Sequence, residues 1–370
     1  MSNITVIGGG IVGCMTALTL ARRGHQVTIV ERNQIAAQTS GESSWAGAGV
    51  LLPLLPWMYK DEVNILSMRG AALYPAICQQ LLDETGVDPE YTQSGMLLLP
   101  SPSEKLGEKP VEKQLTKEQA QQATAWCDAN HQPLIEASPA YIARQGLTVE
   151  SAGKEGLMSG LILTSVAQVR PPNLLQALKA SLLQNGVKLI EHTELVPLKS
   201  TKQINTWATT TGDVLTADQF VVTSGAWSFD LLKETAAELH IKPMRGQILL
   251  YKQPKQTLQH IVYSQGFYIV PRRDGYLLAG STLEDVGFDC STTEDVKQEL
   301  QAKAEGIYPS LKNTPIIKHW SGLRPGTPDN IPTIAAHPSI KNLFLNTGHF
   351  RYGLTMAPAS AERLANLIAG

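Results

Sequence analysis

The sequence predicts a mixed α/β protein whose two domains are interleaved along the chain. A strand, a glycine-rich turn and a helix open the chain, and a second passage of strands and helices begins near residue 160. A β-rich section then precedes a last strand and a last helix. With 370 residues, of which 43% are hydrophobic, the chain is too long for one simple core. This order of elements favours two domains that share the chain over two units joined by one linker.

The first 31 residues form a strand-helix-strand unit with a dinucleotide-binding fingerprint. ITVIGGG is a short buried strand that enters a glycine turn, IVGCMTALTLARRG is a helix, and HQVTIVER is a second apolar strand. Gly8, Gly10 and Gly13 have the spacing GxGxxG, which permits a tight turn, close approach of a pyrophosphate and close helix packing. Glu31 follows 18 positions after Gly13, where its carboxylate can bind ribose hydroxyls. This unit predicts a Rossmann-like domain.

The later elements follow from periodicity and turn residues. Residues 43–57 are small and apolar with two prolines, which indicates a loop rather than a helix. A helical pattern spans residues 61–85, is interrupted at Pro75 and closes at Gly86. We expect a polar surface helix within residues 100–133 and a strand-helix-strand passage over residues 160–192. A buried strand begins at residue 218 and ends in a turn of small residues, and two later strands are joined by a turn at Asp274-Gly275. Residues 342–370 predict a strand, a glycine turn and an amphipathic helix.

Composition and charge exclude several classes of function. The formal net charge is −2 and basic residues are scattered, so we expect no binding to nucleic acid. Residues 4–21 carry no charged side chain, but four glycines and three threonines within them argue against a membrane span. The leader MSN lacks the basic region of a signal peptide. The four cysteines are widely spaced and lack metal-ligand spacing, so we expect reduced thiols in a cytoplasmic protein and no metal site. They are Cys14, Cys78, Cys127 and Cys290.

The single fingerprint bears on the source of electrons. No second copy of the glycine motif follows the first. An enzyme that reduced a flavin with NAD(P)H would need another nucleotide pocket. If the dinucleotide is FAD, its electrons are therefore expected to come from the organic substrate itself.

Several longer motifs are similar to one known family. They are VIGGGIVG, VERN, SSWAGAGVLLPLLPW, EYTQSGMLLL, VTSGAWS, RGQIL, YIVPRRDGYLLAGST, WSGLRPGTPDNIP and GHFRYGLTMAPA. Through them the chain resembles, nearly end to end, the FAD-dependent D-amino-acid oxidase superfamily, and within it the glycine-oxidase branch that serves thiamin (thiazole) biosynthesis. The fingerprint is shared by many flavoproteins, whereas GLRPGTPDNIP and GHFRYG, with Arg324 and Arg351 27 positions apart, are far more specific.

The resemblance implies a discontinuous FAD-binding domain and a substrate-binding domain built on a β-sheet. The FAD-binding domain would comprise residues 1–85, 145–225 and 325–370, and the substrate-binding domain residues 86–144 and 226–324. Related sarcosine oxidases hold flavin covalently through a cysteine in their C-terminal half. The cysteine of this region here, Cys290, lies outside the shared motifs, so FAD is expected to bind noncovalently.

The resemblance also implies four residues at the substrate. Arg324 would bind the substrate carboxylate, because a guanidinium pairs bidentately with a carboxylate. Tyr268 would share that carboxylate through its hydroxyl. Leu283 would limit the room beside the α-carbon, and Arg351 would lie near the flavin ring and the substrate. A structural ion pair, a half-buried strand tyrosine and ordinary core packing are the respective alternatives for Arg324, Tyr268 and Leu283.

The remaining site residues would bind the cofactor. Small residues after residue 42 would let the backbone approach the flavin ring, and the turn before the last helix would pass its pyrimidine edge, with the helix dipole directed at the flavin. Val169 resembles a position that pairs its backbone with adenine. The full set is Gly8, Gly10, Ile11, Val12, Gly13, Glu31, Arg32, Ser43, Ser44, Ala46, Gly47, Ala48, Gly49, Val50, Val169, Gly225, His349, Arg351, Tyr352, Gly353, Leu354 and Thr355.

The activity implied is oxidative deamination of glycine or another small amino acid or amine by hydride transfer to flavin. The products would be an oxo acid (glyoxylate from glycine), ammonia and, with oxygen as the acceptor, hydrogen peroxide; another electron acceptor is the alternative. No side-chain base is needed, since the substrate amine must only be unprotonated and aligned. The protein could act alone or as a homo-oligomer.

Three other functions were weighed against this one. A D-amino-acid, sarcosine or iminodiacetate oxidase or dehydrogenase of the same superfamily fits the same motifs. Tyr352 stands where smaller or amide residues are common in the family, and an inward ring would narrow the pocket. A tRNA-modification protein would need a basic face and usually a fused methyltransferase domain, and the chain shows neither. A regulator that binds a dinucleotide without catalysis would not need Tyr268, Arg324 and Arg351.

Overall fold

A six-stranded sheet contains the N-terminal fingerprint. The computed structural model describes residues 1–39, 41–100, 115–148, 159–254 and 258–369. Five strands run parallel, and an antiparallel strand lies at one edge. The chain adds strands first on one side of β1 and later on the other, so a crevice opens beside β1 at the carboxyl ends of the strands. The order is β17 (Thr333–Ala336), β18 (Leu343–Thr347), β11 (Gln219–Val222), β1 (Asn3–Ile7), β2 (Gln26–Val30) and β8 (Lys188–Ile190).

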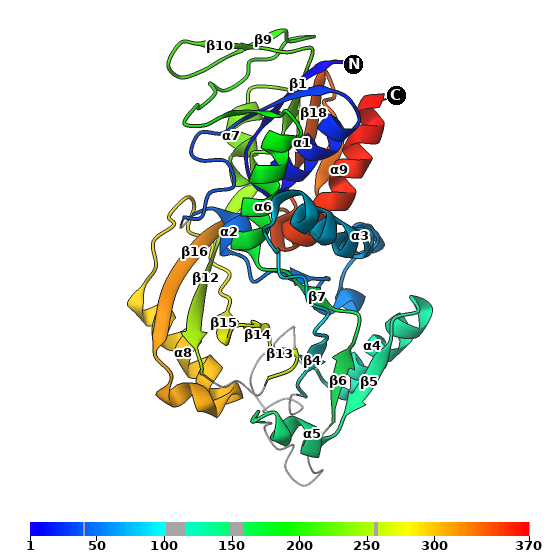
Figure 1. Ribbon diagram of the computed structural model, residues 1–370, viewed down its shortest axis with the longest axis vertical. Helices are drawn as coiled ribbons and strands as arrows, with labels where there is room; N and C mark the ends of the chain where they lie inside the picture. Colours follow the sequence, from blue (N-terminus) through cyan, green and yellow to red (C-terminus); the bar gives the residue numbers. More distant parts are fainter. Residues whose placement is uncertain (40, 101–114, 149–158, 255–257, 370) are drawn as a thin grey trace.

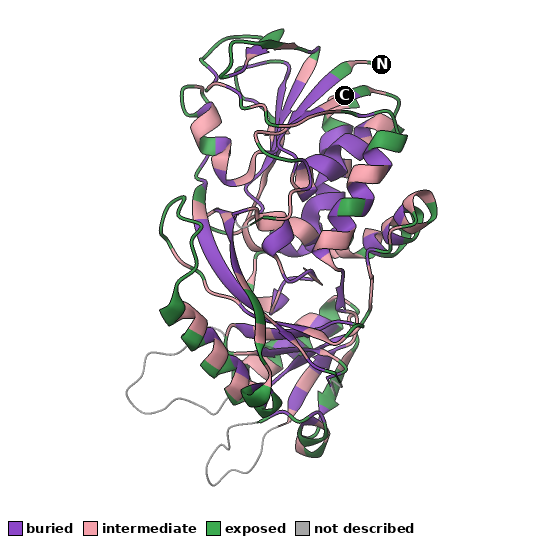
Figure 2. Cartoon of the chain, turned by 60° about the vertical axis from the view of Figure 1, so that its left-hand side comes forward, coloured by how far each residue is buried: buried purple, intermediate pink, exposed green. Residues whose placement is uncertain are grey.

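Four helices pack together beside this sheet. They are α1 (Ile11–Arg22), α3 (Asp61–Thr85), α6 (Pro171–Gln184) and α9 (Gly353–Ala369). Helix α9 packs on α1 and α3, and α6 packs on the same two helices, so the first and last helices lie side by side and both termini lie at one end of the molecule (Figure 1). Buried residues make up most of α1 and about half of α6 and α9, whereas α3 is largely exposed or half-buried, and Figure 2 shows buried residues on these helices and on the strands beside them. The fold thereby brings the N-terminal fingerprint next to the turn that precedes α9.

An eight-stranded sheet forms the other half of the molecule. Its two longest strands, β12 and β16, pair antiparallel along their length and run from this half toward the six-stranded sheet (Figure 1). The predicted turn at Asp274-Gly275 is present between β14 and β15, with Gly275 at φ 84°. The order is β16 (Ile316–Gly326), β12 (Lys242–Lys252), β15 (Tyr276–Gly280), β14 (Phe267–Pro271), β13 (Ile261–Ser264), β4 (Met96–Leu98), β6 (Gly160–Leu163) and β5 (Leu134–Ala137).

The predicted division of the chain into two domains stays a prediction, and strand β6 falls on the other side of it. Strand β6 lies in the eight-stranded sheet, where it pairs with β4 and β5, although residues 145–225 were assigned to the FAD-binding domain. The remaining elements are α2 (Ser43–Ala46), β3 (Val50–Leu51), η1 (Pro56–Met58), α4 (Lys117–Ala129), α5 (Pro139–Arg144), β7 (Ala167–Gln168), β9 (Thr206–Ala208), β10 (Val214–Thr216), η3 (Gly225–Trp227), α7 (Ser228–Leu232), α8 (Glu294–Ile307), η4 (Pro309–Asn313) and η5 (Phe350–Tyr352).

The structure differs from two of the predictions about local structure. Residues 43–57 are not a plain loop, because they contain α2, β3 and η1; Trp45 of α2 packs against Trp320, with ring centroids 5.4 Å apart, and this contact holds a single helical turn. Helix α3 is not interrupted at Pro75 but continues to Thr85, and Gly86 ends it at φ 72°. The helix predicted within 100–133 is α4, and residues 101–114 of that stretch lie outside the described residues.

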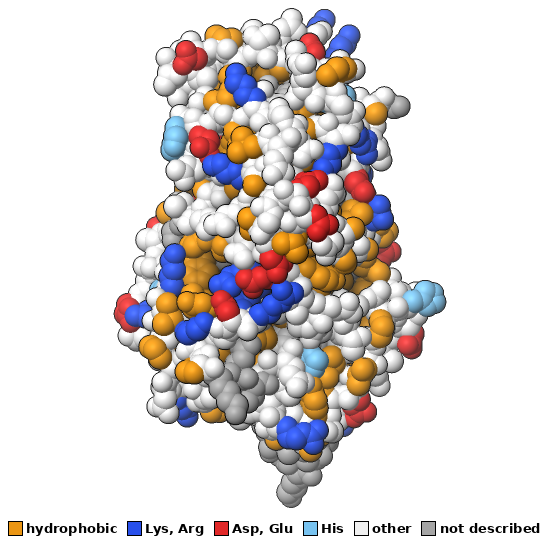
Figure 3. Space-filling model, viewed as in Figure 1, with side chains coloured by type: hydrophobic (Ala, Val, Ile, Leu, Met, Phe, Trp, Pro, Cys, Tyr) orange, Lys and Arg blue, Asp and Glu red, His pale blue; other side chains and the backbone are white. Residues whose placement is uncertain are grey.

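The surface gives no sign of a membrane helix. Among the described residues, no helix is both long and apolar enough to cross a bilayer. On the face shown in Figure 3, acidic and basic side chains are interspersed. All four cysteines are free thiols, three of them buried and Cys290 exposed.

Candidate active site

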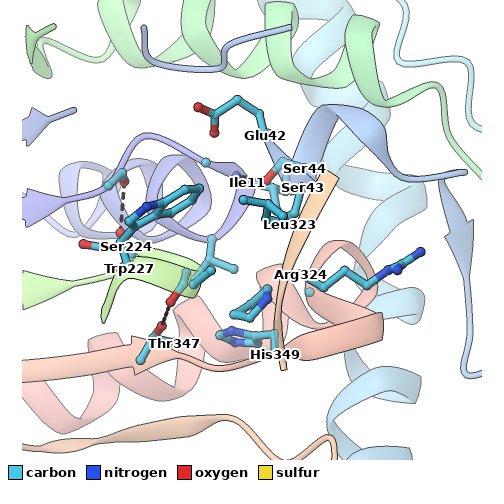
Figure 4. A pocket seen from close by; sticks show the side chains of 18 of the residues that line it. Ile11, Glu42, Ser43, Ser44, Ser224, Trp227, Leu323, Arg324, Thr347 and His349 are labelled. Atoms are coloured by element: carbon cyan, nitrogen blue, oxygen red, sulfur yellow. Dashed lines mark hydrogen bonds between the residues drawn. The ribbon is translucent and has the colours of Figure 1, made fainter. Parts of the chain in front are cut away.

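A cavity of about 420 Å³ lies at the carboxyl ends of the parallel strands. Its walls include the last residues of β1 and β2, the residues after β11, and the turn between β18 and α9. It extends to Tyr268 and Arg324 of the eight-stranded sheet, so both halves of the molecule contribute to it. Figure 4 shows Trp227 and Arg324 on opposite sides of this pocket. The cavity is therefore long enough to join the fingerprint to the predicted substrate residues.

The glycines of the fingerprint are required by close contacts. Gly8 has φ 112°, and a Cβ there would lie 2.8 Å from the backbone of Thr223. A Cβ on Gly13 would lie 1.9 Å from the Gly8 carbonyl oxygen, so this glycine sets the distance between α1 and β1. A Cβ on Gly10 would lie 3.1 Å from Ser44 Oγ. The backbone at the start of α1 is thus left open to a ligand, as pyrophosphate binding at a helix N-terminus needs.

The carboxylate of Glu31 is fixed at the end of β2. It accepts hydrogen bonds from the backbone N–H groups of Gly9 (2.7 Å) and Asn33 (2.9 Å) and lines the cavity. The neighbouring Arg32 guanidinium lies 3.6 Å from the ring centroid of Trp227, which also lines the cavity. This end of the cavity therefore has an oriented hydrogen-bond acceptor and an aromatic wall, which suit a ribose and an adenine.

The segment from Ser43 to Val50 forms another wall and is held by backbone contacts. Ser44 Oγ accepts a hydrogen bond from the Ile11 N–H at 2.9 Å, which ties α2 to the start of α1. Gly49 has φ 73°, and a Cβ there would lie 2.1 Å from the Val169 carbonyl oxygen. Thr355 Oγ1 donates to the Val50 carbonyl at 3.1 Å and joins this wall to α9. The wall thus presents mainly backbone to the cavity.

Two buried polar side chains at the cavity have atoms without a partner. Asn346 Oδ1 and His349 Nε2 accept or donate no hydrogen bond within the described residues. Both side chains line the cavity and are almost fully buried. Burial lowers the pKa of His349 to about 3, so its imidazole is neutral. Because buried polar atoms are normally satisfied, these two indicate a ligand with polar groups at this position.

Arg324 lies at the far end of the cavity and its guanidinium has a fixed position. Its Nη1 donates to the Thr282 carbonyl at 3.1 Å and its Nη2 to Ser281 Oγ at 2.8 Å. Burial and the neighbouring Arg351 lower its pKa, while a hydrogen bond with Tyr268 raises it. A guanidinium has five N–H donors and stays protonated, so donors remain for an anion in the cavity. Tyr268 and Arg351 line the same cavity, and the roles of all three residues at a substrate stay a prediction.

Tyr352 points into the protein and forms part of the cavity wall. Its ring packs edge-to-face on Tyr59 with centroids 5.2 Å apart, and it is buried. Burial and Tyr59 raise the pKa of the Tyr352 phenol well above its ordinary value, so it stays protonated. This inward orientation of the Tyr352 ring is the one expected to narrow the substrate end of the cavity.

Most of the predicted site residues line one cavity, and four do not. Gly13 acts one layer behind it through helix packing. Val169 has both backbone groups bonded within the chain, to the Gly49 carbonyl and to Arg272. Leu283 is 42% exposed and lies outside the lining, as does Ala46. None of the four cysteines lines the cavity, so noncovalent binding stays the prediction.

Sequence reasoning missed several groups of lining residues, among them Trp227 and Asn346, and the order of the strands could have located one of these groups. That group follows β8 and comprises Thr193, Glu194, Leu195 and Pro197. A strand ending near residue 192 was predicted, and the carboxyl ends of parallel strands meet at one edge of a sheet. Applying that rule to β8 would have placed these residues beside Glu31. The cavity would hold FAD through the Gly8–Gly13 turn, Glu31, the 43–50 wall and the turn around His349, and these residues fit that group.

The chain is similar to known proteins over nearly its whole length. Residues 3–367 match the family model described as FAD dependent oxidoreductase. The chain is 37% identical to a glycine oxidase of Pseudomonas putida, over 99% of this chain and 94% of that protein. It is 30% identical to the bifunctional protein ThiO/ThiG of Trichormus variabilis, over 99% of this chain and 52% of that protein. The crystal structure of glycine oxidase from Geobacillus kaustophilus superposes with a TM-score of 0.86 at 26% identity, covering 100% of this chain and 94% of the other. The chain is a member of the FAD-dependent oxidoreductase family.

Proposed function

We propose that this enzyme oxidatively deaminates glycine or another small amino acid. The observation that carries the proposal is the cationic end of the cavity, where Arg324 lies with Tyr268 and Arg351 beside it. An arginine held by two hydrogen bonds and open to a cavity is a binding site for a carboxylate. The same cavity continues to the cofactor-binding residues, so a carboxylate at Arg324 would lie next to the cofactor.

The residues of the chain act by binding and orientation. Arg324 and Tyr268 would hold the carboxylate and thereby direct the α-carbon toward the cofactor. FAD supplies the acceptor for the two electrons and the hydrogen that leave the α-carbon. Loss of this hydride from the neutral amine gives an imine and one proton, and water then hydrolyses the imine to an oxo acid and ammonia. Burial lowers the pKa of His349 to about 3, which makes its imidazole a weak proton acceptor and supports a reaction without a side-chain base.

The size of the substrate is inferred from the walls of the cavity. Tyr352, Leu52 and Leu54 are large side chains that line the same cavity as Arg324, and they would restrict the room for a bulky substrate side chain. The relative in Pseudomonas putida is named glycine oxidase, and the ThiO/ThiG protein of Trichormus variabilis joins a similar chain to a second unit. Both names support glycine as the first candidate substrate and a role in thiazole or thiamin biosynthesis.

A second candidate function is oxidation of a D-amino acid, sarcosine or iminodiacetate, by an oxidase or a dehydrogenase. The position of Leu283 supports this second candidate function. This side chain was expected to limit the room beside the α-carbon, but it lies outside the lining of the cavity. A larger substituent on the α-carbon or on the nitrogen therefore meets Tyr352 rather than Leu283.

The proposal extends to the acceptor and the cell compartment. Molecular oxygen would reoxidise the cofactor and give hydrogen peroxide, with another electron acceptor as the alternative. Free thiols at all four cysteines support a reducing compartment, the cytoplasm. The chain would act as a monomer or a homo-oligomer.

The proposal is tested by anaerobic reduction of the FAD-loaded protein. Glycine, sarcosine, D-alanine and D-proline are mixed separately with the wild type and with Arg324→Ala, and loss of the flavin absorbance is followed. We expect glycine to reduce the wild type and the variant to lose about 10²–10³-fold in rate at low substrate, since truncation of one partner of a buried charge pair costs about 2–5 kcal/mol. Admission of air then separates oxidase from dehydrogenase. If none of the four reduces the wild type, the proposed substrate class is wrong.

A further inference from the structure

The guanidinium of Arg324 is positioned by a segment from another part of the chain. Both hydrogen-bond acceptors named above, Thr282 O and Ser281 Oγ, belong to residues 281–284, which follow β15. Gly246 of β12 lies directly beneath the guanidinium, because a Cβ there would be 2.0 Å from Arg324 Nη1. The direction of Arg324 therefore depends on where residues 281–284 lie relative to β12.

A buried ionic network attaches this segment to β12. The backbones of Arg245 and Glu284 exchange two hydrogen bonds, each 2.9 Å long. The Arg245 guanidinium donates to Glu284 Oε2 at 2.6 Å and to Asp289 Oδ2 at 2.6 Å. Side-chain exposure is 5% for Arg245 and 19% for Glu284. A pair this buried strongly resists separation, because one partner alone would leave an uncompensated charge.

The hydroxyl of Thr282 connects this network to the anchor. Thr282 Oγ1 accepts from the Gln247 N–H at 2.8 Å and donates to Glu284 Oε1. Fully buried Gln247 donates to the same carboxylate at 3.0 Å. Burial raises the pKa of Glu284, but hydrogen bonds from Arg245, Thr282 and Gln247 outweigh this and lower it, so the carboxylate stays ionised. One threonine thus has its side chain in the network and its carbonyl on Arg324.

The network and the anchor lie on opposite faces of β12. Side chains alternate along a strand, so Arg245 and Gln247 point to one face while Gly246 faces the Arg324 guanidinium. The Glu284 carboxylate is therefore held away from Arg324 and does not occupy the donors that a substrate carboxylate needs. It supports the anchor through the backbone of Thr282, and its negative charge also acts directly to raise the pKa of Arg324.

We propose that the Arg245–Glu284–Thr282 network is a positioning device that holds Arg324 in the direction required for carboxylate binding. The inference rests on the proposed function, because it requires Arg324 to bind the substrate carboxylate. None of the three residues is part of the cavity lining, so they act through the anchor. Their removal weakens carboxylate binding while FAD binding is retained.

Thr282 gives the sharpest test. Thr282→Val keeps the shape of the side chain but removes the hydroxyl, whereas Thr282→Ser keeps the hydroxyl. Thr85→Val is the matched control: Thr85 Oγ1 also donates one hydrogen bond (Leu81 O, 2.6 Å) and accepts one (Val87 N, 3.2 Å), at the end of α3 outside the cavity lining. Each FAD-loaded variant is titrated with glycolate, a carboxylate without an amine, and the change in flavin absorbance gives Kd.

We expect Thr282→Val to weaken glycolate binding and to raise the KM for glycine about tenfold, the effect of losing one hydrogen bond to a charged group. Its kcat should change less than its KM, because the lost interaction serves binding. Thr282→Ser and Thr85→Val should stay within about twofold of the wild type. Flavin content and Tm are measured for each protein. Equal Kd values for Thr282→Val and the wild type would overturn the inference.

A second variant separates positioning from general loss of structure. The double variant Arg245→Met, Glu284→Leu removes both charges and leaves no buried charge alone, so it is expected to fold. It should retain flavin and lose glycolate affinity about tenfold or more. Wild-type glycolate affinity in this variant would overturn the inference. Unchanged glycolate affinity in Arg324→Ala would instead show that the proposed function is wrong, so the two failures are distinguishable.

Discussion

The two ends of the cavity are built in different ways. At the fingerprint end, Gly8 and Gly13 lack side chains, so the backbone of Thr223 and the start of α1 can pack directly against the end of β1. At the anchor end, Arg324 projects a long side chain whose direction is set by residues 281–284 and by a network behind β12. The fingerprint end depends on the lack of side chains at a few positions of one short segment. The anchor end depends on side chains that the fold brings together from distant segments.

The difference predicts where each end is most sensitive to mutation. A glycine packed against backbone atoms is disturbed by any added side-chain atom, because the neighbouring backbone has little freedom to move away. A positioned side chain is disturbed by changes in its supports, even where these are far from it in sequence. The variants below test this contrast, from the largest expected effect to the smallest.

The largest effect is expected for Gly13→Ala. The added Cβ would lie 1.9 Å from the Gly8 carbonyl oxygen and would push α1 away from β1. We expect the purified protein to lose FAD affinity by about 100-fold or more, as an overpacked backbone contact costs about 1–3 kcal/mol or more. Flavin content and FAD titration of the apoprotein measure this. The control is Gly306→Ala in α8, where nothing lies within 4 Å of the new Cβ and helix propensity favours alanine. Full FAD affinity in Gly13→Ala would remove the contrast between the two ends.

A smaller and more selective effect is expected for Gly246→Ala. The new Cβ would lie 2.0–2.4 Å from the Arg324 guanidinium, which is the end of a flexible side chain and can move. We expect the KM for glycine to rise about 10- to 100-fold while FAD affinity stays within about threefold of the wild type. Steady-state kinetics and FAD titration separate the two quantities.

The same substitution in an Arg324→Ala background provides the control. With the guanidinium gone, Gly246→Ala has nothing to displace, so the double variant should bind glycolate no worse than Arg324→Ala alone. A further loss in the double variant would mean that Gly246 supports the strand rather than the anchor.

The same contrast explains what the sequence could predict. The fingerprint is local, so the spacing of Gly8, Gly10 and Gly13 and the position of Glu31 were enough to predict a strand, a turn and a helix that the structure contains. Resemblance to a family supplied Arg324, Tyr268 and Arg351. Neither approach found Thr282, Glu284 and Arg245, because the contacts of β12 with residues 281–284 join positions 35 or more apart and no periodic pattern records such a contact. Hydrophobic pattern also failed at α2, where a tertiary contact between Trp45 and Trp320 holds one helical turn.

The smallest expected effect concerns His349, which contrasts with Arg324 as a second buried basic side chain at the cavity. Arg324 has hydrogen-bond acceptors and stays charged, whereas burial lowers the pKa of His349 from 6.5 to about 3. The unfolded chain therefore binds a proton below pH 6.5 that the folded protein does not, so this residue contributes stability above pH 6.5 that is lost as the pH falls toward 3.

Between pH 8 and pH 5 this loss in the free energy of unfolding is about 2 kcal/mol. His349→Gln should show a correspondingly smaller decrease in the free energy of unfolding, measured by urea denaturation of the FAD-loaded protein at both pH values. His131→Gln is the control, because it makes the same substitution at an exposed histidine outside the cavity lining. An equal decrease in His349→Gln and the wild type would mean that a partner stabilises the imidazolium in the folded protein, and the two basic side chains would then not differ in kind.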